Sequence, residues 1–132
     1  MADKLDTVNP LLAEKIKKIL AAMDALGFPL KVIQGRRTEI YQHELWLQGR
    51  DVHGNIVDAK KIVTNADGYI KKSNHQSGNA VDCAFLDADG KVTFDEHYPW
   101  ALYGKMGETL GLTWGGTFKG LSDLGHLELK HV

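Results

Sequence analysis

Two histidines and one aspartate are spaced along the chain in a way that suits a metal ion. His75 and Asp82 lie seven positions apart, separated by a glycine and small residues, and His126 follows much later. Two imidazoles and one carboxylate are a plausible ligand set for catalytic zinc, which keeps its fourth position for water. Asp123, three positions before His126, would then be free to handle protons on that water. These residues predict a zinc centre with a proton-transferring carboxylate beside it.

Asp82 lies on a predicted strand over residues 80–86. Alternation along the strand puts Asp82 on one face and Cys83 and Phe85 on the other. A charged carboxylate at the start of an apolar strand is costly unless it is paired or bound to a cation. The cost favours a metal ligand, with a hydrogen-bonded structural aspartate as the alternative. Cys83 is predicted to be a small buried residue.

The other elements follow from hydrophobic spacing and from turn residues. Helices are predicted over about residues 10–26, from a cap at Thr38 to about 48, and over 97–111. Strands are predicted over 30–35 and 125–129. A hairpin turn is predicted over 87–90, followed by a second strand over 91–94. Residues 50–72 are predicted to be a functional or mobile loop. A bend at Gly125 is required, since Asp123 and His126 would face opposite sides of a continuous strand.

Two further features are singled out by type alone. Gly115 and Gly116 stand between two aromatic residues, which indicates unusual backbone dihedrals or the close approach of another group. His43, His53 and His131 have no partner at ligand spacing, and each is predicted to lie on the surface.

Composition bounds the class of protein. The 132 residues are enough for one domain, and 43% of them are hydrophobic, which favours a globular fold. Sixteen basic residues balance seventeen acidic ones, so neither nucleic acid nor an anionic membrane is an expected partner. The single cysteine rules out an intramolecular disulfide framework. No secretory signal and no membrane span are predicted, so synthesis in the cytoplasm is expected.

Several motifs stand in order along the chain: Gly35-x-Arg37-Thr38 with Gln42, then Ser73-x-His75-x-x-Gly78-x-Ala80-Val81-Asp82, then Trp114-Gly115-Gly116-x-Phe118, and last Asp123-x-x-His126-x-Glu128. Together they resemble the zinc-dependent peptidoglycan peptidases of the D-alanyl-D-alanine carboxypeptidase and L-alanyl-D-glutamate peptidase family. The resemblance runs from about residue 30 to 129. It implies a compact α+β fold of the hedgehog-like type, an antiparallel sheet flanked by helices, as a single zinc peptidase domain over residues 1–132.

The resemblance also implies roles for individual residues. His75, Asp82 and His126 match the zinc ligands. Asp123 matches the catalytic acid or base, and Arg37 matches an arginine that stabilises the substrate carbonyl or carboxylate.

Three more residues are assigned to substrate binding. Ser73 matches a small polar residue near the metal in the family, and Trp114 belongs to one of the matched motifs. Glu128 lies two positions beyond His126 on the same face of the strand, so it could bind a substrate amine. Glu128 could instead support a zinc ligand or form an ordinary cross-strand pair. Arg36 stands where the family often has an aromatic residue, which leaves the substrate details open.

The leading hypothesis is therefore a zinc-dependent endopeptidase that cuts the peptidoglycan stem peptide between L-alanine and D-glutamate. A small monomer without a wall-binding domain resembles phage endolysins, which reach the wall through a separate membrane pore. The first alternative is a D-alanyl-D-alanine carboxypeptidase or dipeptidase, for which Arg36 could bind the terminal carboxylate. The second is a catalytically silent zinc domain that binds wall fragments or a partner protein.

Overall fold

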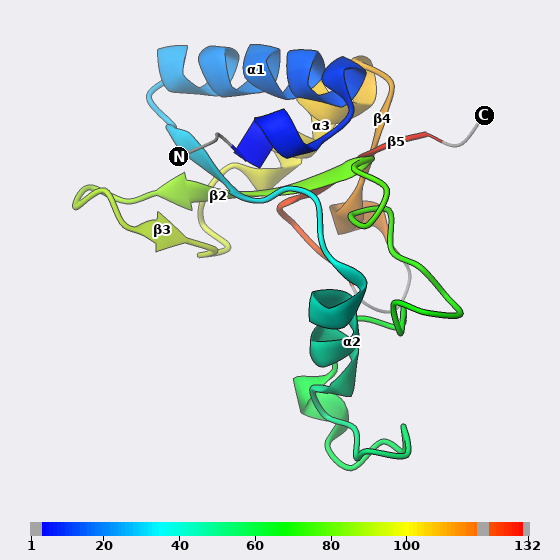
Figure 1. Cartoon of the computed structure of the whole chain (residues 1–132). Coiled ribbons are helices and arrows are strands. Elements are labelled where there is room, and N and C mark those ends of the chain that lie inside the picture. Colours follow the sequence, from blue (N-terminus) through cyan, green and yellow to red (C-terminus); the bar gives the residue numbers. More distant parts are fainter. Residues whose placement is uncertain (1–3, 119–121, 131–132) are drawn as a thin grey trace.

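The computed structural model describes residues 4–118 and 122–130 of the chain. The elements in order are η1 (Lys4–Thr7), α1 (Pro10–Ala25), β1 (Leu30–Gln34), α2 (Glu39–Leu47), η2 (Ala59–Lys61), β2 (Ala80–Leu86), β3 (Val92–Thr93), α3 (Trp100–Thr109), β4 (Leu112–Trp114), η3 (Gly115–Thr117) and β5 (His126–Leu129), where η denotes a 3-10 helix. Figure 1 shows one sheet with α1 and α3 beside it and α2 projecting away. The predicted α+β fold with flanking helices is confirmed.

The sheet is antiparallel throughout, with strand order β1-β2-β5-β4 and with β3 paired to the far end of β2. Strands β2 and β5 are therefore neighbours although they are distant in sequence. Their register pairs Asp82 directly with His126, and Val81 with Leu127. Residues directly opposite in a sheet point to the same face, so the register alone brings two predicted ligands together.

The hydrophobic core lies on the other face of the sheet. Val81, Cys83 and Phe85 of β2 belong to one buried cluster with residues of α1 and α3. The members from the two helices are Leu12, Ala13, Ile16, Ile19 and Met23 of α1 and Trp100 and Tyr103 of α3. The predicted alternation is confirmed, and burial raises the pKa of the Cys83 thiol to about 12.

Helix α1 begins where its sequence predicts. The Asn9 side chain accepts a hydrogen bond of 3.0 Å from the Leu11 amide, and Pro10 occupies the first helical position. The helix ends at Ala25, and Gly27 follows with φ of +90°. Among the described residues, no helix is both long and apolar enough to cross a membrane.

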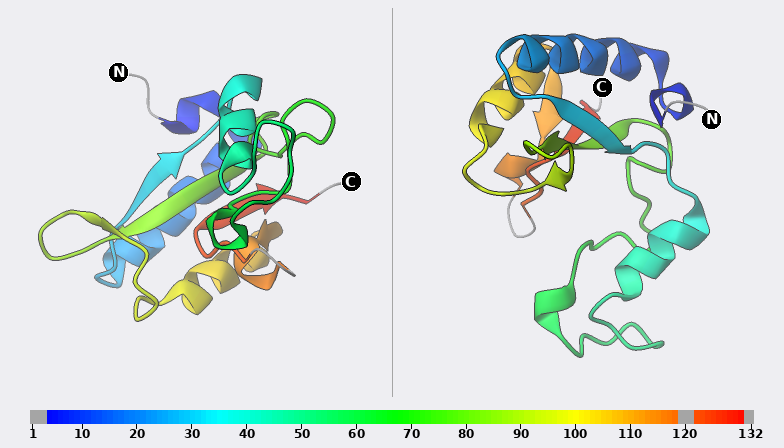
Figure 2. Two further views of the ribbon diagram at one scale, coloured as in Figure 1. Left: turned by 90° about the horizontal axis from the view of Figure 1, so that it is seen from below. Right: turned by 90° about the vertical axis from the view of Figure 1, so that its left-hand side faces the viewer.

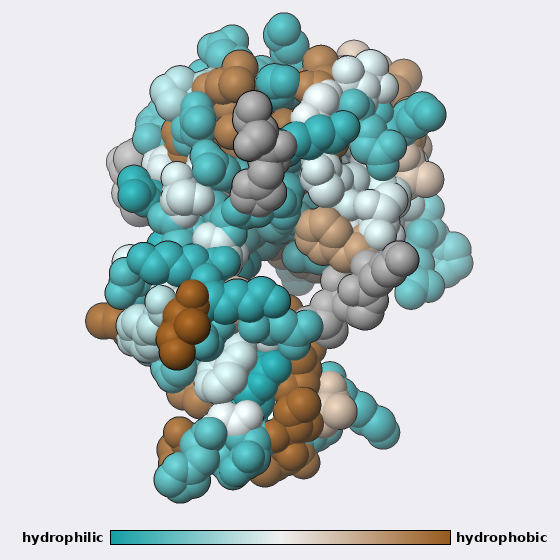
Figure 3. All heavy atoms as spheres, turned by 90° about the vertical axis from the view of Figure 1, so that its right-hand side faces the viewer, coloured by the Kyte–Doolittle hydropathy of each residue, from teal (hydrophilic) through white to brown (hydrophobic). Residues whose placement is uncertain are grey.

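Helix α2 and residues 48–72 form an arm that extends from the sheet, as the right-hand view of Figure 2 shows. Arg50 organises the arm, because its guanidinium donates to the carbonyls of Trp46 (2.6 Å) and Thr64 (3.0 Å) and lies 4.6 Å from the centre of the Trp46 ring. The segment predicted as a long loop therefore has turns, a 3-10 helix and an Arg50–Ile56 bridge. Figure 3 shows hydrophobic side chains exposed on this lower half of the molecule.

Two expectations need correction in detail. Helix α3 begins at Trp100 rather than at residue 97, because the Asp95 carboxylate accepts a 2.9 Å bond from the His97 amide and Pro99 holds Tyr98 out of the helix. His43 is half-buried rather than on the surface, with its Nδ1 2.8 Å from the Asp67 carbonyl and its ring stacked on Trp46.

The other two histidines predicted to lie on the surface have different outcomes. His53 is exposed, as predicted. His131 lies outside the described residues.

Candidate metal centre

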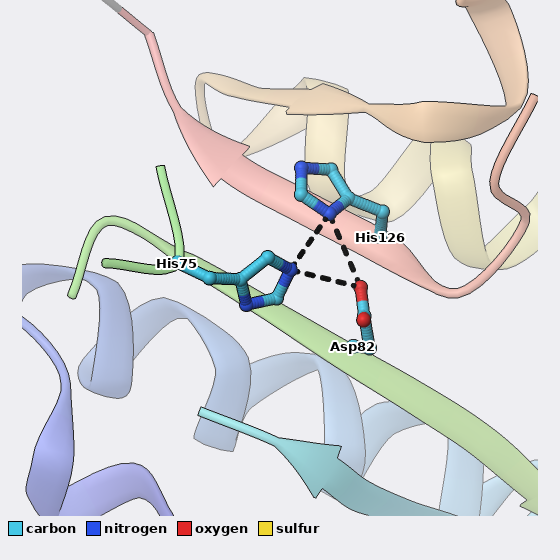
Figure 4. A group of neighbouring side chains, drawn as sticks. All are labelled: His75, Asp82 and His126. Atoms are coloured by element: carbon cyan, nitrogen blue, oxygen red, sulfur yellow. Dashed lines mark hydrogen bonds and ion pairs between the residues drawn. The ribbon is translucent and has the colours of Figure 1, made fainter. Parts of the chain in front are cut away.

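Three side chains from separate segments converge on the face of the sheet opposite the core (Figure 4). Asp82 comes from β2, His126 from β5, and His75 from the turn that precedes β2. The His75 Nε2 lies 3.3 Å from the Asp82 Oδ1 and 3.1 Å from the His126 Nδ1, and the Asp82 Oδ1 lies 3.1 Å from the His126 Nδ1. All three residues are buried, and they form the only cluster of this kind in the described part of the chain.

The three spacings fit a tetrahedral zinc ion. Nitrogen and oxygen ligands at the usual bond length of ~2.0–2.1 Å from zinc lie about 3.3–3.4 Å from one another. The observed separations of 3.1, 3.1 and 3.3 Å agree with that edge length. Two neutral imidazoles and one carboxylate would hold zinc and leave one position of the tetrahedron open.

The turn that carries His75 is fixed by its own hydrogen bonds. The His75 amide donates to the Ser73 hydroxyl (3.2 Å), and the His75 carbonyl accepts from the Arg37 amide (2.9 Å). Gly78 closes the turn with φ of +77°, a conformation that favours glycine. The glycine in the motif therefore serves to bring the chain from His75 into β2.

Each of the three side chains is also held by a contact to an atom that faces away from the shared centre. The His75 Nδ1 lies 3.0 Å from the Gly35 carbonyl, which fixes that nitrogen as the donor and leaves Nε2 to bind a metal. The His126 Nε2 lies 2.7 Å from the Glu128 carboxylate, and the Asp82 Oδ2 accepts a 3.0 Å bond from Arg37. Such contacts keep the ligand atoms aimed at one point.

The electrostatics of the centre favour a cation. Burial would raise the pKa of Asp82, but its close contacts with the His126 and His75 imidazoles hold that pKa well below its ordinary value. Burial would lower the pKa of His126, but hydrogen bonds to Asp82 and Glu128 raise it to about 9. In the absence of metal, positive charge is thus held between two carboxylates, where a metal ion would replace the proton.

Asp123 lies at the mouth of the centre. Its Oδ2 is 4.0 Å from the His126 Nδ1, and its side chain remains 48% exposed. Burial and the negative charge of Asp82 raise the pKa of Asp123 above its ordinary value. A half-exposed carboxylate of raised pKa beside a ligand set is suited to accept and return a proton.

Gly115 holds Asp123 in this place. The Asp123 amide donates to the Gly115 carbonyl (2.9 Å), and a Cβ on Gly115 would clash with the Asp123 carbonyl oxygen and lie 2.7 Å from the His126 Cβ. Neither Gly115 nor Gly116 has positive φ. Of the two interpretations of the paired glycines, close approach is the correct one. The turn predicted at Gly125 falls between Asp123 and His126, as β5 begins at His126.

The remaining predicted site residues lie at different depths. Arg37 is nearly buried, and it donates to Asp82 (3.0 Å) and to the Gln42 side chain (3.1 Å). Trp114 packs against Gly104 and donates its indole N–H to the Leu124 carbonyl (2.7 Å). Trp114 thus supports the turn between Asp123 and His126, and the substrate-binding roles of Trp114 and Arg37 stay predictions.

Ser73 and Glu128 also have clear positions. Ser73 lines an open groove beside the centre, and its role in substrate binding stays a prediction. Glu128 accepts a hydrogen bond from the Asn74 side chain, and its other carboxylate oxygen lies 2.7 Å from the His126 Nε2. The geometry favours the alternative in which Glu128 supports a metal ligand.

Gln42 is the part of the site whose function the sequence did not predict. This fully buried side chain accepts from Arg37 and donates to the Thr64 hydroxyl (3.3 Å) and the Ala66 carbonyl (2.9 Å). It therefore links α2, the loop of the arm and the arginine beside Asp82. Its place in the upstream motif was the available signal, because amphipathic spacing alone does not distinguish a buried glutamine from an exposed one.

Comparison with known proteins agrees with this geometry. The family model described as D-alanyl-D-alanine carboxypeptidase matches residues 67–129, which include the three clustered residues and Asp123. The peptidoglycan L-alanyl-D-glutamate endopeptidase CwlK of Bacillus subtilis (strain 168) is 32% identical over 130 residues, covering 92% of this chain and 73% of CwlK. The chain belongs to the D-alanyl-D-alanine carboxypeptidase family of metallopeptidases, peptidase family M15.

Solved structures place the fold in the same family. The L-Ala D-Glu endopeptidase ChiX of Serratia marcescens is 26% identical with a TM-score of 0.66, and the match covers 96% of this chain and 84% of ChiX. Two further structures share the fold. The LD-carboxypeptidase LdcB is 20% identical with a TM-score of 0.64, and the match covers 98% of this chain and 73% of LdcB. The D,D-pentapeptidase VanY from the VanB-type resistance cassette is 15% identical with a TM-score of 0.64, and the match covers 92% of this chain and 72% of VanY.

Proposed function

We propose that the protein is a zinc-dependent endopeptidase that hydrolyses the bond between L-alanine and D-glutamate in peptidoglycan stem peptides. The observation that carries the proposal is the buried set of His75, Asp82 and His126 at tetrahedral spacing, with Asp123 at its open side. CwlK and ChiX, which resemble this chain over nearly its whole length, are both L-alanyl-D-glutamate endopeptidases.

The residues divide the chemistry among them. When zinc is bound, it supplies Lewis acidity that polarises a carbonyl and makes a water molecule more acidic. Asp123 accepts the proton of the attacking water and returns it to the amine that leaves. Glu128 and the Gly35 carbonyl keep His126 and His75 in the orientation that presents one nitrogen each to the metal.

Arg37 adds a positive charge beside the metal centre. Its guanidinium lies against the Asp82 Oδ2, on the side of the carboxylate away from the two histidines. This contact holds Asp82 in one orientation and adds positive charge where a substrate carbonyl would become negative. Direct contact between Arg37 and the substrate carbonyl is part of the proposal.

A D-alanyl-D-alanine carboxypeptidase is the second candidate, and the description of the matching family model favours it. The two activities leave different products. An endopeptidase releases peptides that begin with D-glutamate, whereas a carboxypeptidase releases only terminal D-alanine.

Mass spectrometry of purified peptidoglycan after digestion by the zinc-loaded protein tests the proposal, with a chelator-treated sample as control. New peptides that begin with D-glutamate, absent from the chelated sample, are the expected result. Loss of terminal D-alanine alone would assign the protein to the second candidate. An undigested wall would favour a domain that only binds. Action as a monomer and phage-type release to the wall remain predictions.

A further inference from the structure

An open groove of about 720 Å³ lies beside the metal centre, where the arm joins the main body. Arg36, Arg37, Lys72 and Ser73 line it, together with Glu39. Figure 3 shows that the surface around this junction is mainly hydrophilic. Three cationic side chains and one acidic one make the groove attractive to an anionic group.

The cations of the groove are not equivalent. Arg37 is engaged by Asp82 and Gln42, and Lys72 pairs with Glu39 at 3.4 Å. Arg36 is exposed and has no carboxylate partner within residues 4–118 and 122–130. Arg36 is thus the cation of the groove that is available to a ligand.

The Arg36 side chain is nevertheless held in place. Its Nε donates to the Gln76 carbonyl (3.2 Å), and its amide donates to the Thr7 hydroxyl (3.1 Å). Gln76 follows the predicted ligand His75 directly, so the anchor of Arg36 belongs to the same turn as the metal centre. With Nε used as the anchor, the two terminal nitrogens remain to bind a carboxylate in a two-pronged manner.

The substrate of the proposed reaction has a carboxylate next to the bond that is cut, so this inference rests on the proposed function. Glutamate has two carboxyl groups. In an endopeptidase substrate one of them continues the chain, and the other is free, only a few bonds from the nitrogen of the bond that is cut. We propose that Arg36 determines specificity by binding this free carboxylate of the D-glutamate residue.

Two synthetic peptides test the proposal with the zinc-loaded protein. They contain the same L-alanyl-D-glutamyl bond and differ only in whether the free glutamate group is a carboxylate or a carboxamide. The wild type is expected to favour the carboxylate peptide by about tenfold to a hundredfold in kcat/KM, the usual worth of hydrogen bonds to a charged group. Arg36→Gln should abolish the preference and leave kcat/KM on the carboxamide within about twofold, because a carboxamide carries no charge for the guanidinium to bind.

Lys72→Gln is the matched control, since it removes an exposed cation from the same groove that already has an acidic partner. It should keep the wild-type preference. Zinc content and Tm should be unchanged in both variants, because Arg36 and Lys72 are exposed. If Arg36→Gln retains the wild-type preference, or if Lys72→Gln loses it equally, Arg36 is not the carboxylate site.

Dissociation constants for both peptides, measured by calorimetry, separate this inference from the proposed function. Absence of hydrolysis of both peptides would overturn the proposed function, while tighter binding of the carboxylate peptide that depends on Arg36 would still support the site. Equal binding of the two peptides would overturn the site. A third peptide that ends in D-alanyl-D-alanine covers the other source of carboxylate: dependence on Arg36 for this peptide alone would assign Arg36 to a chain terminus instead.

Discussion

The two oxygens of Asp82 perform two tasks. Oδ1 faces the nitrogens of His75 and His126, while Oδ2 accepts a hydrogen bond from Arg37. A buried carboxylate is stable only if its charge is matched. The Arg37 guanidinium supplies part of that match. Asp82 is therefore hydrogen-bonded, as one alternative drawn from the sequence holds, and its Oδ1 also faces the two histidines, as the predicted ligand would; the ligand role stays a prediction.

Asp123→Asn should retain zinc and the fold while hydrolysis of the wall falls by about 10²–10⁴-fold. An amide has nearly the same size as the carboxylate but cannot accept the proton of water, and Asp123 is not one of the three clustered residues. The rate of peptide release and the zinc content by atomic spectroscopy are the measurements. Activity near that of the wild type at full zinc occupancy would show that another group accepts the proton.

Glu128→Gln should weaken zinc binding by about 10–100-fold, because it removes the negative charge that lies 2.7 Å from the His126 Nε2. Competition with a chromogenic chelator measures the affinity. Glu44→Gln is the control, since Glu44 lies exposed on α2. Equal affinities for the two variants would mean that His126 is oriented without Glu128.

At the scale of elements, the β2–β5 register is what creates the centre. It places His126 opposite Asp82, and the turn at 124–125 then carries Asp123 to the mouth. Helical spacing and caps predicted α1 and α2, and alternation predicted which face of β2 is buried. Those signals are local, and each is repeated over several residues.

Other features could not be predicted because they depend on contacts between distant segments. The Arg37–Asp82 pair joins residues 45 positions apart, and the burial of Gln42 depends on a loop more than 20 positions later. Residue type and spacing do not encode such distances. The grouping of His75, Asp82 and His126, which the structure confirms, was predicted from their residue types and from motifs with a characteristic order.

Gly115→Ala should disturb the centre through the backbone. The added Cβ would clash with the Asp123 carbonyl oxygen and lie 2.7 Å from the His126 Cβ, so η3 and the start of β5 must separate. Both zinc affinity and hydrolysis are expected to fall by at least about tenfold. Binding is measured by calorimetry, and hydrolysis by release of soluble peptide.

Gly90→Ala serves as the control for that variant. Gly90 has φ of +77° in the β2–β3 turn, and a Cβ added there would meet no heavy atom within 4 Å, so the change should cost about 1 kcal/mol of stability. Zinc affinity should stay at the wild-type value. A similar loss of affinity in both variants would point to general destabilisation instead of a local clash.

At the scale of the whole molecule, zinc should stabilise the fold more strongly as the pH rises from about 6.5 to 9. The pKa of His126 in the metal-free protein is raised from 6.5 to about 9, so its bound proton stabilises the metal-free fold fully below about 6.5, and this contribution is lost as the pH passes 9. Zinc needs the neutral imidazole, so its binding must displace that proton, at a cost of about 1.4 kcal/mol per pH unit below the pKa.

Thermal unfolding with saturating zinc and with a chelator, at several pH values, measures this effect. The difference between the two Tm values should widen steadily from about pH 6.5 to 9. A difference that is constant over this range would show that His126 is already neutral in the metal-free protein.

The centre also brings together segments that are far apart along the chain and that no disulfide links. His126 is 51 positions from His75 and 44 from Asp82, and the sequence has a single cysteine, Cys83, which is buried. An ion held by all three residues would act as a cross-link between the loop before β2 and the C-terminal strand. Unlike a disulfide, such a cross-link resists reducing agents and opens with chelators or acid. The ion proposed to act in hydrolysis would therefore also stabilise the fold as a reversible cross-link. The stability that it adds would depend on the metal supply and not on redox conditions.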